Sequence, residues 1–234
     1  MAMLSESDSP ESTESSQEQV RQRWEKLFVQ FESPEQERRK FIRRLKSLGV
    51  AKWDKGLRVV ELFCGRGSGL AAWEALGFKR IEGVDLSPRL LSDYSGRFPC
   101  HEGDVRNLPF ADESFDVACV QGGLHHLELP DGLEQALREI HRVLRPKGKL
   151  VLVEPWQTLY LRVVHFLMSI TVVQQLYRPL GIYAELCELE RNTFEPWLNK
   201  PEVILRKLAH YAESVRLRKR FGKLMYVGIR KEVA

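Results

Sequence analysis

Three glycines follow a short apolar run that contains an acid. The stretch VVELFCGRGSG, residues 59–69, holds Glu61 together with Gly65, Gly67 and Gly69. Glycine lets the backbone adopt a positive φ and approach a ligand closely, because it carries no Cβ. A strand that leads into such a turn and then into a helix is typical of a nucleotide-binding loop. These residues therefore predict a site for a nucleotide-like ligand at the end of a buried strand.

A second acid narrows the choice of ligand. The next strand pattern, RIEGVD at residues 80–85, ends in Asp85, which lies 20 residues beyond Gly65. A carboxylate at that spacing can accept hydrogen bonds from the hydroxyls of a ribose, which fits NAD and other adenosine ligands equally. Glu61 distinguishes among them, since a carboxylate repels a pyrophosphate but attracts a sulfonium and an α-amino group. We therefore expect S-adenosylmethionine.

Further motifs follow this loop in order. They are IEGVDLSPRLL (81–91), EGDVRNLPFADESFDVACVQGGLHHL (102–127) and LREIHRVLRPKGKLVLVEP (137–155). With the glycine loop they cover about residues 57–155 and resemble the class I S-adenosylmethionine-dependent methyltransferases, in particular the type 11-like branch that includes quinone-biosynthesis enzymes. The resemblance implies methyl transfer to a small, apolar or aromatic acceptor, with no metal.

The resemblance also implies roles for individual residues. Glu61, Gly65 and Gly67 would lie against the methionine portion of the cofactor, and Gln121 would lie near the methionine backbone. Asp85 would hold the ribose, and Leu86 would pack on the adenine. Asp104 and the amide of Val105 would bind the edge of the adenine. The family usually has glycine where this chain has Phe63. This departure predicts an altered pocket floor.

Two histidines are candidates for the proton acceptor. His125 and His126 follow the strand pattern FDVACVQ, at the edge where the carboxyl ends of parallel strands meet. Imidazole titrates near neutral pH, so either ring is suited to take a proton from the acceptor. The alternative is that both rings only pack at the start of the following helix.

The order of patterns predicts the fold class. Short β-branched runs alternate with helical stretches over residues 58–155, which indicates a doubly wound, mostly parallel α/β sheet. Residues 213–231 read as an antiparallel hairpin around Phe221-Gly222, and the resemblance implies a seven-stranded Rossmann-like sheet. We expect a disordered acidic tail at 1–16, helices at 17–50, and a methyltransferase domain at 51–234 with a helical insertion at about 156–210.

Charge and hydropathy leave other functions open. The net charge is +4, but residues 1–20 contain five acids and no Lys or Arg, which leaves the rest at 36 basic and 27 acidic residues. That basic body also fits an RNA or protein methyltransferase, and a non-catalytic nucleotide-binding module is a further alternative. The apolar residues 159–177 suit a lid over an apolar acceptor or a peripheral membrane contact. Scattered cysteines and the lack of a secretory signal favour a cytoplasmic location. The oligomeric state stays open.

Overall fold

The computed structural model describes residues 10–232, and side chains from residue 18 onward. Helix α1 (Pro10–Phe31) begins inside the segment expected to be disordered, so that expectation is wrong for residues 10–16, while residues 1–9 lie outside the described part. Helix α2 (Pro34–Ser47) follows, with a capping box formed by Ser33 and Gln36.

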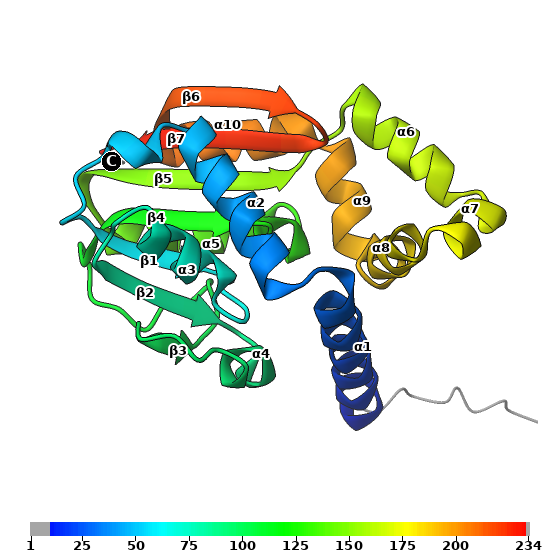
Figure 1. Cartoon of the computed structure of the whole chain (residues 1–234). Helices are drawn as coiled ribbons and strands as arrows, with labels where there is room; N and C mark the ends of the chain where they lie inside the picture. The colour runs from blue at the N-terminus through cyan, green and yellow to red at the C-terminus, as the bar shows by residue number, and fades with distance from the viewer. Residues whose placement is uncertain (1–9, 233–234) are drawn as a thin grey trace, which may run out of the picture.

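A single seven-stranded sheet with the order β3-β2-β1-β4-β5-β7-β6 forms the body of the molecule (Figure 1). Its strands are β1 (Arg58–Leu62), β2 (Arg80–Asp85), β3 (Cys100–Glu102), β4 (Phe115–Gln121), β5 (Leu144–Pro155), β6 (Ala212–Arg220) and β7 (Lys223–Arg230). Strands β1 to β5 pair in parallel, whereas β7 is antiparallel to both β5 and β6. The predicted fold class and the terminal hairpin are confirmed.

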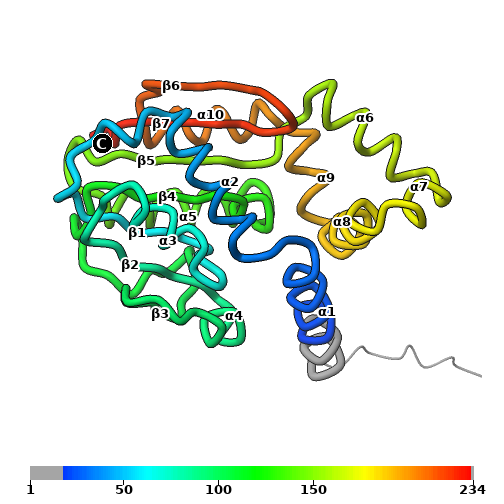
Figure 2. The backbone as a smooth tube through the Cα atoms, in the orientation of Figure 1, coloured from blue at the N-terminus to red at the C-terminus, as the bar shows by residue number. Residues whose placement is uncertain are grey.

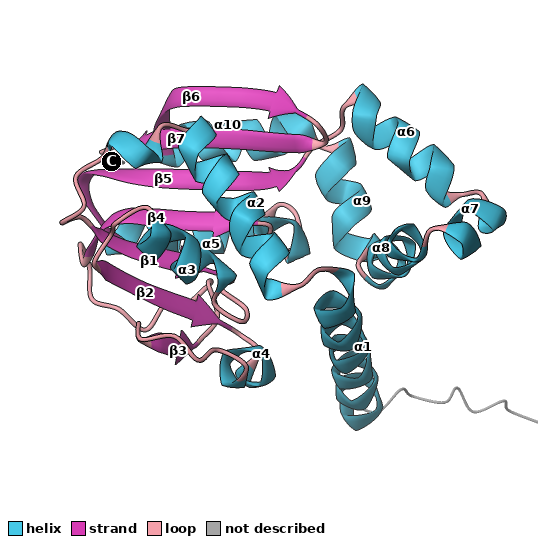
Figure 3. Cartoon of the chain, in the orientation of Figure 1, coloured by secondary structure: helices cyan, strands magenta, loops and turns pink. Residues whose placement is uncertain are grey.

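Helices cover both faces of this sheet (Figure 3). One layer holds α2, the short η1 (Val50–Lys52), α3 (Ser68–Ala75) and α4 (Pro88–Ser92), and the other holds α5 (Asp131–Val143) and α10 (Pro201–Tyr211). Successive strand residues point to opposite faces, so Val60 and Leu62 pack with α5 and α10, while Val59 packs with α2 and α3. Burial on both faces explains why these strands are apolar without alternation.

The insertion between β5 and β6 is helical, as expected. It comprises α6 (Leu159–Met168), α7 (Thr171–Leu176), α8 (Arg178–Leu189), α9 (Arg191–Asn199) and α10, and Figure 2 shows α6 and α7 standing away from the sheet. Helix α8 lies beside α1, so the N-terminal segment and the insertion meet beyond the carboxyl ends of the strands. These two segments therefore cover the carboxyl edge of the parallel strands.

Candidate functional site

Four polar side chains mark the carboxyl ends of adjacent strands. Glu61 comes from β1, Asp85 from β2, Gln121 from β4 and Glu154 from β5. A short 3-10 helix, η2 (Leu124–His126), follows β4 at the same edge. In a doubly wound sheet this edge is where ligands bind, because the loops that leave the strands splay apart there.

Glu61 is held inside the protein. Its Oε2 accepts a 2.7 Å hydrogen bond from the indole of Trp73, and its Oε1 accepts one of 3.3 Å from Nε2 of Gln121. Burial disfavours the charged form and raises the pKa of Glu61 to about 7. The other amide atom, Oε1 of Gln121, is buried and has no partner among the described residues. This pair therefore offers a negative group and an unsatisfied acceptor, which suits a cationic donor such as an α-ammonium.

The glycine loop has the conformations that the sequence predicts. Gly65 and Gly67 have φ of 52° and 83°, and Phe63 also has a positive φ, 55°. That left-handed backbone favours glycine, which explains the residue usual in the family at this position. The ring of Phe63 packs over Gly123, where a Cβ would lie 2.2 Å from Cγ of Phe63. The residue that replaces the usual glycine is therefore an aromatic side chain, and the lack of a Cβ at Gly123 leaves room for its ring.

Asp85 ties the glycine loop to the second strand. Its Oδ2 accepts from the amide of Gly65 at 2.7 Å, and its Oδ1 accepts from the amide of Ser87 at 2.9 Å. Leu86 follows with 53% of its surface exposed, although it is a large apolar residue at the mouth of the site. This exposure leaves Leu86 accessible to the adenine that the family resemblance implies beside the ribose.

The remaining predicted cofactor residues lie one strand further out. The amide of Gly103 donates to the carbonyl of Asp85 at 3.0 Å, which places Asp104 beside the end of β2. The carboxylate of Asp104 pairs with Arg106 at 2.6 Å, and this hydrogen bond lowers its pKa. Val105 is buried in the core. Binding an adenine edge would therefore require Asp104 to share its oxygens between Arg106 and the ligand.

Tyr94 covers part of the loop and was not predicted. A Cβ on Gly67 would lie 2.1 Å from Cδ2 of the Tyr94 ring. Arg66, in the same loop, is buried and pairs with Glu37 at 3.3 Å. Glu25, buried in α1, accepts a 2.5 Å hydrogen bond from Ser87. Helix α2 thus contacts the glycine loop through Glu37, and helix α1 contacts the segment after β2 through Glu25.

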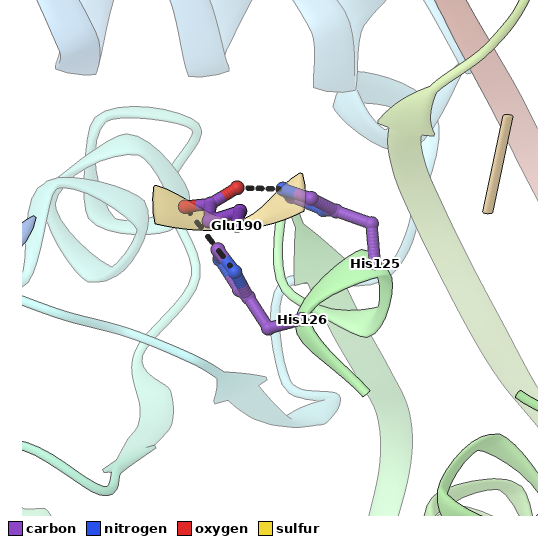
Figure 4. Close-up of side chains that lie close together, drawn as sticks. All are labelled: His125, His126 and Glu190. Carbon is purple, nitrogen blue, oxygen red and sulfur yellow. Dashed lines mark ion pairs between the residues drawn. The ribbon is translucent and has the colours of Figure 1, made fainter. Parts of the chain in front are cut away.

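The two histidines lie in different electrostatic environments. Nδ1 of His125 is 2.8 Å from Oε2 of Glu154, and its Nε2 is 3.6 Å from Oε2 of Glu190 (Figure 4). Burial works to lower the pKa of His125, but these two carboxylates outweigh it and raise the pKa to about 9. His126 has Nδ1 3.4 Å from Oε1 of Glu190, and burial lowers its pKa to about 4. At neutral pH His125 is charged and His126 is neutral.

Glu154 and Glu190 complete this cluster. Glu154 is fully buried and accepts 2.9 Å hydrogen bonds from the amides of Gly123 and Leu124, so it caps η2. Glu190 comes from the end of α8 and also accepts from the indole of Trp24 in α1. His125, His126 and Glu190 offer ligand atoms within 4.8 Å of one another, a spacing compatible with a metal ion. Nε2 of His125 and Nδ1 of His126, however, already face the two different carboxylate oxygens of Glu190 (Figure 4).

Sequence reasoning missed Trp24, Tyr94 and Glu190. Trp24 is one of several apolar residues in the helices expected at 17–50, and Glu190 is one of several acids in a helical insertion. No local pattern marks these residues. The roles of Trp24 and Glu190 depend on α1 meeting α8, and that of Tyr94 depends on its ring packing on Gly67.

Comparison with known proteins gives a consistent result. A model of the methyltransferase domain matches residues 60–152. A demethylmenaquinone methyltransferase of Chlorobaculum parvum is 33% identical over 101 residues, which cover 42% of this chain and 41% of that protein. The corresponding enzyme of Alkalihalophilus pseudofirmus is 30% identical over 161 residues, which cover 62% of this chain and 66% of that protein. The chain therefore spans less than half the length of the first relative and about two thirds of the second.

A solved structure shares the fold. The PH0226 protein of Pyrococcus horikoshii superposes with a TM-score of 0.61 at 22% identity, covering 82% of this chain and 91% of that one. At this level of identity the likeness concerns the fold alone.

Proposed function

Because the chain belongs to the class I S-adenosylmethionine-dependent methyltransferase family, we propose that it transfers a methyl group to a small apolar or aromatic acceptor of the quinone type. The observation that carries the methyl-transfer part of the proposal is the buried pair of Glu61 and Gln121, whose unsatisfied oxygen lies at the ends of β1 and β4 and suits the α-ammonium of the cofactor. The relatives named above act, by their names, on demethylmenaquinone. Their similarity supports an acceptor of that class.

The residues of the site fit the cofactor of this family. Gln121 and Glu61 would hold the amino-acid portion, Asp85 the ribose, and Leu86 the adenine. When bound, the cofactor supplies a methyl group already activated by its sulfonium. The chain then has to align the acceptor and keep water out, tasks that suit α1 and α8 because they border the site.

Aromatic rings gather where α1 meets the carboxyl edge of the sheet. Trp24 stacks on Phe28 at 5.0 Å and meets His126 edge-on at 5.4 Å, and Phe63 lies 6.3 Å from His126. Rings arranged in this way offer flat apolar contacts to an aromatic acceptor. They support an aromatic rather than a sugar-like or peptide acceptor.

Of the two candidate bases, we propose His126 as the proton acceptor and His125 as a positioning residue. His125 is already protonated at neutral pH and is held between Glu154 and Glu190. His126 faces Glu190 through Nδ1, so its Nε2 keeps a lone pair for the proton that leaves the acceptor. Burial lowers the pKa of His126 to about 4, so this ring is unprotonated at neutral pH.

The test is methyl transfer with quinone-type acceptors. The purified chain is incubated with S-adenosylmethionine and a set of quinols of different tail length, and products are identified by the added mass of one methylene unit. We expect methylated quinol and a rate that falls at least tenfold in Trp24→Ala. Equal rates with quinols and with sugar or peptide acceptors would contradict the acceptor class.

A further inference from the structure

Large apolar side chains are exposed on α6, on α7 and at the tip of the β6–β7 hairpin. Leu159 is 78% exposed, Phe166 67%, Leu176 83% and Phe221 62%. We use the term docking face for these residues together with Tyr160, Val163, Leu167, Val172 and Tyr177. Exposed apolar residues that gather in one region mark an interaction site, whereas scattered ones do not.

The hairpin tip and α6 form one continuous part of this face. The rings of Tyr160 and Phe221 are 6.0 Å apart, edge to face. The amide of Trp156 donates to the carbonyl of Gly222 at 2.9 Å, and the amide of Gly222 donates to Oγ1 of Thr158 at 3.0 Å. Figure 1 shows the hairpin turn next to the start of α6, at the end of the molecule where the parallel strands finish.

Phe221 occupies a position that its local structure does not favour. Phe221 and Gly222 have φ of 48° and 69°, and they form the two-residue turn of the hairpin. Such turns prefer Asn at the first position, because a bulky residue is strained in the left-handed region. Since the ring is also largely exposed, neither the turn nor the core accounts for an aromatic residue here. The exposed ring is therefore free to make a contact outside the chain.

Charge identifies the kind of partner. No Asp or Glu occurs between Glu154 and Glu185, or between Glu213 and Glu232, so the docking face contains no acid. Exposed cations accompany it, namely Arg162, Arg178, Arg218, Lys219 and Arg220. The guanidinium of Arg220 lies 4.6 Å from the centre of the Phe221 ring. Two copies of this face brought together about a twofold axis would oppose cation to cation, whereas an anionic bilayer is complementary to it.

We propose that the docking face rests on the surface of an anionic lipid bilayer. Its apolar side chains would enter the boundary between headgroups and acyl chains, and the cations beside them would meet lipid phosphates. Among residues 10–232, no helix is both long and apolar enough to cross a membrane, so the contact is peripheral. The proposal rests on the proposed function in one respect, that a bilayer is a source of an apolar acceptor.

The experiment measures co-sedimentation of the full chain with vesicles. Phosphatidylcholine vesicles with and without phosphatidylglycerol are compared at low and high salt, in the absence of cofactor and acceptor. We expect binding to the anionic vesicles that weakens as salt rises. Phe166→Ser combined with Phe221→Ser should lower the vesicle partition coefficient about tenfold or more, and Arg220→Ser about fivefold.

Matched controls lie away from the docking face. Val20→Ser replaces an exposed apolar residue in α1, and Lys79→Ser removes an exposed cation before β2, at the opposite edge of the sheet. Both should bind vesicles as the parent does. Circular dichroism confirms that each variant is folded, which is expected because every replaced side chain is exposed.

Three results would overturn the proposal. They are the lack of vesicle binding, equal binding to zwitterionic and anionic vesicles, and a dimer in sedimentation velocity that Phe166→Ser with Phe221→Ser abolishes. The last result would assign the face to a second copy of the chain. Calorimetry with S-adenosylmethionine without vesicles tests the proposed function separately, so the two can fail independently.

Discussion

Replacing Glu61 by glutamine should stabilise the ligand-free protein and weaken its cofactor site. The Glu61 carboxyl is buried, and its pKa is raised from 4.5 to about 7 because burial penalises the charged form. Glutamine has nearly the same shape. The amide oxygen of the new glutamine can accept a hydrogen bond from Trp73. Its NH₂ group can donate to the unpartnered Oε1 of Gln121 once the Gln121 amide rotates by half a turn.

The size of the effect follows from the titration. Because the pKa of Glu61 is raised in the folded chain, folding favours the protonated acid. The protonated Glu61 carboxyl therefore contributes to the free energy of unfolding in full below about pH 4.5, and this contribution is lost as pH rises through about 7. A difference of about 2.5 pKa units corresponds to about 3 kcal/mol. Between pH 5 and pH 8, the stability of Glu61→Gln relative to the parent should therefore increase by about 2–3 kcal/mol.

Urea denaturation of both proteins at pH 5 and pH 8 measures this difference, and calorimetry measures cofactor affinity. We expect Glu61→Gln to bind S-adenosylmethionine about 1–3 kcal/mol more weakly at pH 8, since the cation loses its carboxylate. The reasoning is refuted if the difference in stability does not change with pH. It is also refuted if the cofactor binds the variant as tightly as the parent.

Three further substitutions test other parts of the site. Asp85→Ala should weaken cofactor binding by about 1–3 kcal/mol, measured by calorimetry. The control Asp54→Ala removes a similar carboxylate–amide hydrogen bond to Gly56 outside the site, and it should leave cofactor affinity unchanged. Gly67→Ala should lower the free energy of unfolding by at least about 1–2 kcal/mol in urea, because the position has φ of 83° and a Cβ would meet the Tyr94 ring; a stable variant would contradict this. His126→Ala should reduce turnover about a hundredfold without changing cofactor affinity. In the parent, kcat should stay constant from pH 6 to pH 8, because the His126 ring is already unprotonated in this range. If the rate of the parent instead rises through pH 9, His125 is the base.

The strands of the sheet could be predicted where burial on both faces requires apolar side chains. Strands β1, β2, β4 and β5 are covered on both faces, so their apolar runs are visible, and the hairpin is marked by its turn at Phe221-Gly222. Strand β3 has only three residues, none of them fully buried, and it escaped notice. Within the helical insertion expected at about 156–210, the apolar stretch 159–177 divides between α6 and α7 at Ser169-Ile170, where no glycine or proline signals a break. Helix α1 extends into a segment whose composition indicated disorder.

The candidate site divides in the same way. Glu61 and Asp85 were identified from their places at strand ends, and Gln121 from the family resemblance. The structure brings Glu61 and Gln121 into contact and joins Asp85 to the glycine loop. Trp24 and Glu190 reach the site only through the packing of α1 against α8. The opposite charge states of His125 and His126 could not be read from two adjacent identical residues, because they depend on which carboxylates face each ring.

Calorimetry of the purified chain with S-adenosylmethionine, S-adenosylhomocysteine and NAD tests most directly whether the carboxyl edge of this sheet holds a cationic sulfur cofactor. We predict saturable binding of the first two at one site per chain, and none of NAD. Binding of NAD, with neither sulfur compound bound, would contradict the account.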